Sequence, residues 1–207
     1  MKTFLRWFLL TSMLLSVPLR AQVNPPSSTA ERDARAKKAT EQRLAYAASA
    51  EYDPYNSKIS AIRKAAFDFL GKDKFPEAIA EAQKGLALSR YNIDLLIILA
   101  TAYRTSGDAD NADKVREQWM SLVDSILRSG TGHDYATAFQ VISVDEEYTV
   151  LRILRLESTN QSLVEHDGSE FDVMQVKDTE SGREGVLYFN VDLPKKWLNK
   201  QLAPPAK

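Results

Sequence analysis

The chain has 207 residues, of which 44% are hydrophobic and 27% are charged, an average balance for a globular protein. Its formal net charge is -1, so no basic excess points to nucleic-acid binding. There are two histidines and no cysteine, which excludes disulfide bridges, thiolate metal sites and thiol nucleophiles. We expect one domain or two small ones, without enzymatic activity and without a cofactor.

The N-terminal residues 1–21 have the three-part pattern of a secretory signal peptide. Two basic residues precede a mostly apolar run over 4–17, and the small residue Ala21 stands before Gln22. The apolar run is shorter than the about 20 residues that a transmembrane helix needs. We predict cleavage between Ala21 and Gln22, and a periplasmic or secreted protein that is not attached to the membrane. The alternative is an uncleaved N-terminal anchor.

A linker over 22–29 leads into a predicted helix. Ser28 and Glu31 have the spacing of a capping box, which marks a helix N-terminus. Residues 30–52 are rich in strong helix formers, and their apolar stripe is thin and mostly alanine. This pattern favours a solvent-exposed helix as much as one that packs on a partner.

An internal period of 34 residues runs through residues 59–126. Small residues recur at the same places in both copies, which lets two antiparallel helices approach closely. The matched pairs are Ile62 with Leu96, Ala66 with Ala100, Phe69 with Tyr103, Phe75 with Ala109, and Ala78 with Ala112. The period and the small residues resemble two tetratricopeptide repeats. We therefore expect two helical hairpins within an α-helical region over 30–130.

Residues 131–202 predict a small α+β segment, followed by a tail over 203–207. A short apolar run over 138–144 indicates a buried strand, and acids at its end favour a helix over 145–156, although a strand also fits there. Three further strands with turns at Asp-Gly and Ser-Gly sequences predict an antiparallel meander, and Pro194 starts a terminal helix. The fold class is thus α+β, with helical hairpins first.

Neither half of the chain is large enough to be clearly stable alone. Two repeats are fewer than the about three that a solenoid needs, and a core of about 70 residues is marginal. An apolar stripe on the last repeat helix supplies a contact surface. Its members are Trp119, Leu122, Val123, Ile126 and Leu127. We expect this stripe to face the C-terminal segment, so that the chain folds as one unit.

Several short runs resemble an exported bacterial family described only as a domain of unknown function. The resemblance covers roughly residues 53–202. The runs are Ser129–Gly132, Thr137–Phe139, Ile142–Tyr148, Asp172–Met174 and Leu187–Val191. It implies export and a layout of repeats followed by a small domain, and it supplies no catalytic residues.

The tetratricopeptide resemblance implies a concave groove lined by the first helix of each pair. The candidate residues are Arg63, Phe67, Ile97, Thr101 and Arg104. The two arginines would hold a carboxylate of the partner by charge-assisted hydrogen bonds, and Phe67 and Ile97 would hold an apolar side chain. Alternatively, the N-terminal helix or the C-terminal segment covers these residues and no open groove exists.

Two other functions stay open. The acids and histidines of residues 133–167 could belong to a cell-envelope hydrolase, although no motif spacing unites His133, Glu146 and His166. The helix over 30–52 could pair with another chain in an assembly. We favour an interaction or scaffold module whose partner is another protein or peptide, with no nucleic acid and no metal site, and with an oligomeric state that the sequence does not define.

Overall fold

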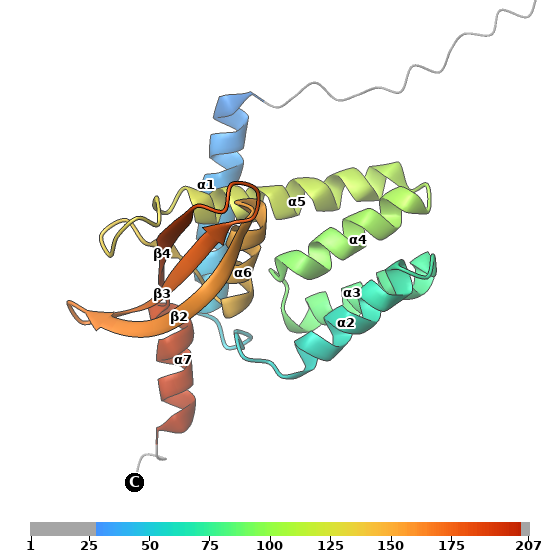
Figure 1. Ribbon diagram of the computed structural model, residues 1–207. Helices are drawn as coiled ribbons and strands as arrows, with labels where there is room; N and C mark the ends of the chain where they lie inside the picture. Colours follow the sequence, from blue (N-terminus) through green and yellow to red (C-terminus); the bar gives the residue numbers. More distant parts are fainter. Residues whose placement is uncertain (1–27, 204–207) are drawn as a thin grey trace, which may run out of the picture.

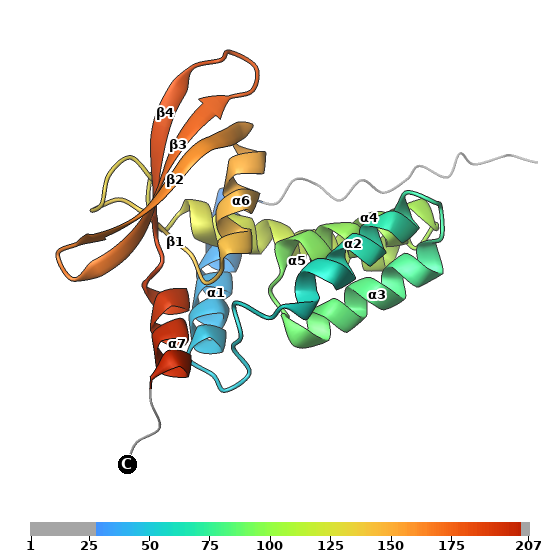
Figure 2. The ribbon, with the colours of Figure 1, turned by 60° about the horizontal axis from the view of Figure 1, so that its bottom comes forward.

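The computed structural model describes residues 28–203. The predicted signal peptide, with its cleavage site at Ala21 and Gln22, lies outside the described residues. The elements are α1 (Thr29–Ala47), α2 (Lys58–Leu70), α3 (Phe75–Leu88), α4 (Ile93–Thr105), α5 (Ala109–Leu127), β1 (Phe139–Gln140), α6 (Val144–Ile153), β2 (Leu156–His166), β3 (Ser169–Asp178), β4 (Glu184–Asn190) and α7 (Asp192–Leu202). The helical pairs and the sheet lie on opposite sides of α6 (Figures 1 and 2).

Helix α1 is packed on one side from Ala36 to Tyr46, whereas its first residues, 29–34, are exposed. It begins with the predicted capping box, in which the Ser28 and Glu31 side chains each bond the other residue's backbone N–H. Its buried side chains, Ala36, Ala39, Arg43 and Tyr46, form one stripe. This stripe packs on the chain itself, chiefly against α5 (Figure 1). Because alanine side chains are small, α1 and α5 approach closely, and even a thin apolar stripe on α1 is buried between them.

The four helices α2 to α5 form two antiparallel pairs. Helices α3 and α5 begin at Phe75 and Ala109, as the period of about 34 residues predicts. Ala66 and Ala78 are completely buried at the contact within the first pair. Side-chain caps mark the start of both helices of the second pair. Asn92 accepts the Leu95 N–H at the start of α4, and Asp108 accepts the Asn111 N–H at the start of α5.

The sheet has the strand order β1-β4-β3-β2. The predicted meander β2-β3-β4 is antiparallel, and its first turn holds Asp167 and Gly168 at φ 50° and 77°, as a two-residue hairpin requires. The predicted strand over 138–144 is shorter than expected: only Phe139–Gln140 pairs, parallel to β4. Val141 and Ile142 beyond it are still buried, so the apolar run reflects burial rather than strand pairing.

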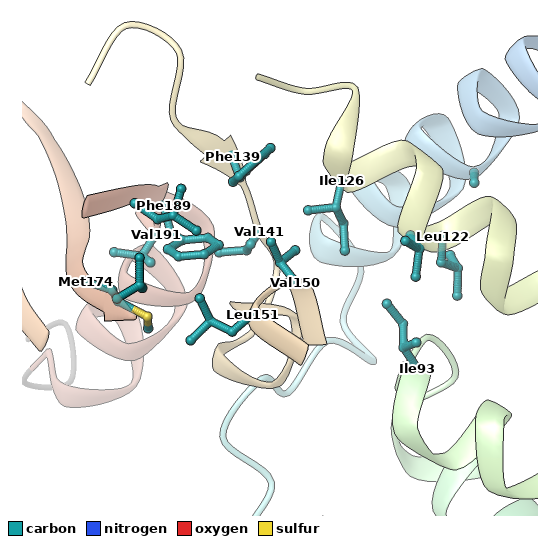
Figure 3. Packing of buried hydrophobic residues seen from close by; sticks show 14 of the residues in the cluster. Ile93, Leu122, Ile126, Phe139, Val141, Val150, Leu151, Met174, Phe189 and Val191 are labelled. Atoms are coloured by element: carbon teal, nitrogen blue, oxygen red, sulfur yellow. The ribbon is translucent and has the colours of Figure 1, made fainter. Parts of the chain in front are cut away.

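Helix α6 confirms the helical alternative for most of residues 145–156, although it ends at Ile153 and Leu156 begins β2, and it joins the two halves. Its residues Val150 and Leu151 face Met174 and Phe189 of the sheet. The same apolar cluster continues through Ile126 of α5 to the helical pairs (Figure 3). One core therefore runs from α1 to the last strand. The stripe of α5 contributes Leu122, Val123 and Ile126 to this core, whereas Trp119 and Leu127 are only partly buried.

Candidate binding groove

A hollow of about 470 Å³ lies between α2, α4 and α6. Its lining residues are Ser60, Arg63, Lys64 and Phe67 from α2, Asp94, Ile97 and Ile98 from α4, and Arg152 from α6. Phe67 is 63% exposed, so neither α1 nor the C-terminal segment covers it. The hollow has the size typical of ligand pockets, which is about 300–1,000 Å³.

The structure brings only three of the five sequence-predicted groove residues together. Arg63, Phe67 and Ile97 line the hollow. Thr101 is exposed further along α4 and donates its hydroxyl to the Ile97 carbonyl at 2.8 Å. Arg104 does not line the hollow; it pairs with Asp113 of α5 instead.

Arg152 of α6 is the second arginine at the hollow. It lines the hollow and forms an ion pair with Asp94 of α4. Its contribution depends on how α6 docks against the helical pairs. No local pattern in the sequence encodes that docking, so sequence reasoning missed this residue.

A network of ion pairs links the hollow to the start of α6. Arg63 contacts Asp94 at 3.0 Å and Asp145 at 2.8 Å, and Asn92 donates to the other Asp145 oxygen at 2.7 Å. Burial raises the pKa of Asp94 even though Arg152 and Arg63 lie beside it. The network ties α2 and α4 to α6 and holds the arginine side chains in place at the rim.

A second, smaller hollow of about 190 Å³ adjoins the first. The two share Ser60 and Arg63. Its other lining residues are Asp53, Pro54, Tyr55, Asn56 and Ile59, with Ser89, Ser143, Val144 and Asp145. Elements outside the two helical pairs therefore build most of it, namely the loop before α2 and the start of α6.

A buried ion pair fixes α1 to α6. The Arg43 guanidinium, 1% exposed, contacts both oxygens of Glu146, with Nε to Oε1 at 2.9 Å. It also donates to Ser125 Oγ at 3.0 Å and to the Gln140 carbonyl at 3.1 Å. Glu146 in turn accepts the Ile142 N–H at 2.9 Å. This cluster of fully bonded charges connects four segments of the chain, α1, α5, the β1 strand and α6.

The next residue, Glu147, has the opposite environment. It is completely buried on the sheet side of α6, and within the described residues neither of its carboxyl oxygens has a hydrogen-bond partner. Burial, with the nearby Asp172 carboxyl, raises the pKa of Glu147 to about 9. Burial also raises the pKa of the Tyr55 hydroxyl, and Asp172 adds to that effect. Glu147 is therefore protonated near neutral pH.

The two histidines lie away from these acids. The His166 ring stacks on Tyr135 at 4.1 Å between ring centroids. By strand alternation His166 lies on the sheet face opposite α6. Asp134, beside His133, accepts hydrogen bonds from Thr137. Within residues 28–203, no group of three His, Asp or Glu side chains is placed to hold a metal ion.

No helix among the described residues has both the length and the apolar character needed to cross a membrane. Neither the curated proteins nor the solved structures contain a match to this chain. A family model for a Domain of unknown function (DUF4919) matches residues 36–200. The match includes Arg43 and Glu146 and both hollows, and it spans most of the sequence. The chain belongs to this family.

Proposed function

We propose that this chain is an exported, non-enzymatic module that binds a segment of another protein in the hollow between α2, α4 and α6. The single observation that carries the proposal is Phe67, a large apolar side chain 63% exposed inside a concave hollow. Exposed apolar surface rimmed by polar groups is typical of interaction sites. Here Arg63, Lys64 and Arg152 form that rim.

The pattern of repeats supports the same role. Two antiparallel helix pairs with buried alanines at their contacts support a reading as tetratricopeptide-like repeats, and such arrays present extended concave surfaces to partners. The signal-peptide pattern over 1–21 supports export to the periplasm or the medium.

The contacts of the side chains favour this function over the two alternatives. A hydrolase site would need the acids and histidines of residues 133–167 to converge. Instead, Glu146 bonds to Arg43 inside the core, while His166 lies on the opposite face of the sheet. An assembly through α1 would use its apolar stripe, but Ala39 and Tyr46 already pack within this chain.

Site-specific photocross-linking in the native host tests the proposal. A benzophenone amino acid at position 67 is expected to give a discrete covalent adduct. The matched control is position 120, where Met120 of α5 is 37% exposed outside the hollow and should give no such adduct. Adding Ile97→Asp to the position-67 protein should abolish the adduct, because it places a charge on the apolar wall.

A melting curve of the Ile97→Asp variant shows whether it is folded, and Ile97→Ser replaces it if it is not. Identical adducts from positions 67 and 120 would contradict the proposal. An adduct that persists in the folded Ile97→Asp or Ile97→Ser variant would also contradict the proposal, because capture of the other protein would then not require the hollow.

A further inference from the structure

The groove has two compartments of opposite charge. The wide hollow around Phe67 has one carboxylate, Asp94, facing three cations, Arg63, Lys64 and Arg152. Lys64 also pairs with Asp68, but both side chains are largely exposed, and exposed pairs of this kind are worth only about 0–1 kcal/mol. Arg63 also pairs with Asp145, so Lys64 and Arg152 are the cations that make the rim of the wide hollow basic, and its wall is apolar.

The narrow hollow is acidic. It contains Asp53 and Asp145, and its only cation is Arg63, which the two hollows share. Asp145 is occupied by Arg63 and Asn92. Asp53 makes no ion pair with any residue in the described range 28–203. One acidic charge thus lines a hollow of about 190 Å³ without a counter-charge, in a space that fits a single side chain.

The length of the wide hollow along α2 sets the spacing of a ligand. Ser60 lines both hollows and is seven residues from Phe67 on α2, which is about 10 Å along the helix axis at about 1.5 Å per residue. An extended chain covers that distance in about three residues. A residue about three positions from the apolar one therefore lies where the two hollows meet, and a long basic side chain reaches from there into the narrow hollow.

We propose that the partner segment is extended and carries an apolar residue, then an acidic residue, then a basic residue about three positions from the apolar one. This inference rests on the proposed function. The apolar side chain contacts Phe67 and Ile97, and the acidic one reaches Arg152 and Lys64. The basic one enters the narrow hollow and pairs with Asp53. The second compartment comes from the loop before α2 and from α6, so this specificity is a property of the whole domain rather than of the helical pairs.

Selection from a phage library of random heptapeptides, on the purified protein, tests the pattern. Selected sequences should contain the order apolar, acidic, basic, read in either chain direction. Selection on Asp53→Lys should keep the apolar and acidic positions but replace the basic residue by an acidic one. A synthetic heptapeptide from the first selection should bind Asp53→Lys about tenfold more weakly, as expected when an attractive contact becomes repulsive.

Asp110→Lys is the matched control, because it makes the same charge change at an exposed position on α5 outside both hollows. It should select the same sequences as the unmodified protein. A heptapeptide whose basic residue is replaced by Glu should recover affinity for Asp53→Lys and lose it for Asp110→Lys.

The possible outcomes separate this inference from the proposed function. Sequences that need Phe67 but show no charge order, or that do not change with Asp53→Lys, would overturn the two-compartment inference and leave the binding function standing. If the unmodified protein enriches nothing beyond what Phe67→Ala enriches, both are wrong.

Discussion

The two faces of the helical pairs differ in whether their apolar side chains are covered by other elements and in where their arginines lie. On the α5 side, α1 and α6 cover the apolar stripe, and a buried arginine completes the contact. On the α2–α4 side, Phe67 stays exposed and the arginines sit at a rim. The covered face contributes to the core, whereas the open face is where we propose that the partner binds.

The comparison also explains the neighbouring glutamates of α6. Successive helical residues point about 100° apart, so Glu146 meets Arg43 from α1 while Glu147 points toward the sheet. One carboxylate is ionised and fully bonded, and the other is protonated and has no bond within the described residues. Changes at these positions should therefore differ in size and in pH dependence.

The largest effect is expected at Arg43. Arg43→Met leaves Glu146 buried without its counter-charge, so it should lower the free energy of unfolding by about 3–5 kcal/mol. Urea denaturation followed by circular dichroism measures this loss. The double variant Arg43→Met/Glu146→Leu should recover part of it, because no unpaired charge remains. Equal losses in the single and double variants would show that packing, rather than charge, fixes α1.

The next effect concerns pH. The folded state holds the Glu147 proton up to about pH 9, whereas the unfolded chain releases it near its ordinary value of 4.5. The folded state therefore binds more protons between these values. The contribution of Glu147 to the free energy of unfolding is greatest below about pH 4.5. It falls by about 1.4 kcal/mol per pH unit as the pH rises toward 9. From pH 6 to pH 8 this is a loss of about 3 kcal/mol.

Glu147→Gln removes this titration and keeps the shape of the side chain. Denaturant midpoints measured from pH 6 to pH 8 should fall steeply in the unmodified protein and much less in the variant. Parallel pH profiles for the two proteins would mean that Glu147 is ionised in the folded state. The exposed Glu157→Gln is the control and should leave the profile unchanged.

A smaller effect is expected within the first helical pair. Ala66 is completely buried among Ile62, Ala82 and Leu95, so Ala66→Leu should overpack the contact and cost about 1–3 kcal/mol. Ala80→Leu makes the same change at an exposed position of α3 and should stay within about 0.5 kcal/mol. Thermal melting compares the two, and equal melting temperatures would argue against close packing of this pair.

The sequence predicted elements whose signals are local. The Ser28 cap, the Asp-Gly turn and the acids at the start of α6 each encode structure within one turn or hairpin, and the 34-residue period encodes two successive helical hairpins. It missed features that depend on distant segments. Arg43 and Arg152 look like ordinary surface cations until α1 and α6 dock, and Thr101 and Arg104 match a repeat position that the hollow does not reach.

The smallest effect on stability, and the sharpest contrast between the two faces, is expected at Phe67. Phe67→Ala removes a side chain that is mostly in solvent, so the free energy of unfolding should change by less than about 0.5 kcal/mol. The same truncation at Phe189, which is completely buried in the core, should cost about 3–5 kcal/mol. Differential scanning calorimetry measures both. A large loss at Phe67 would mean that this ring stabilises α2 and α4, and that it is exposed for structural reasons. An unchanged melting temperature, together with loss of peptide selection by the same variant, assigns Phe67 to recognition alone.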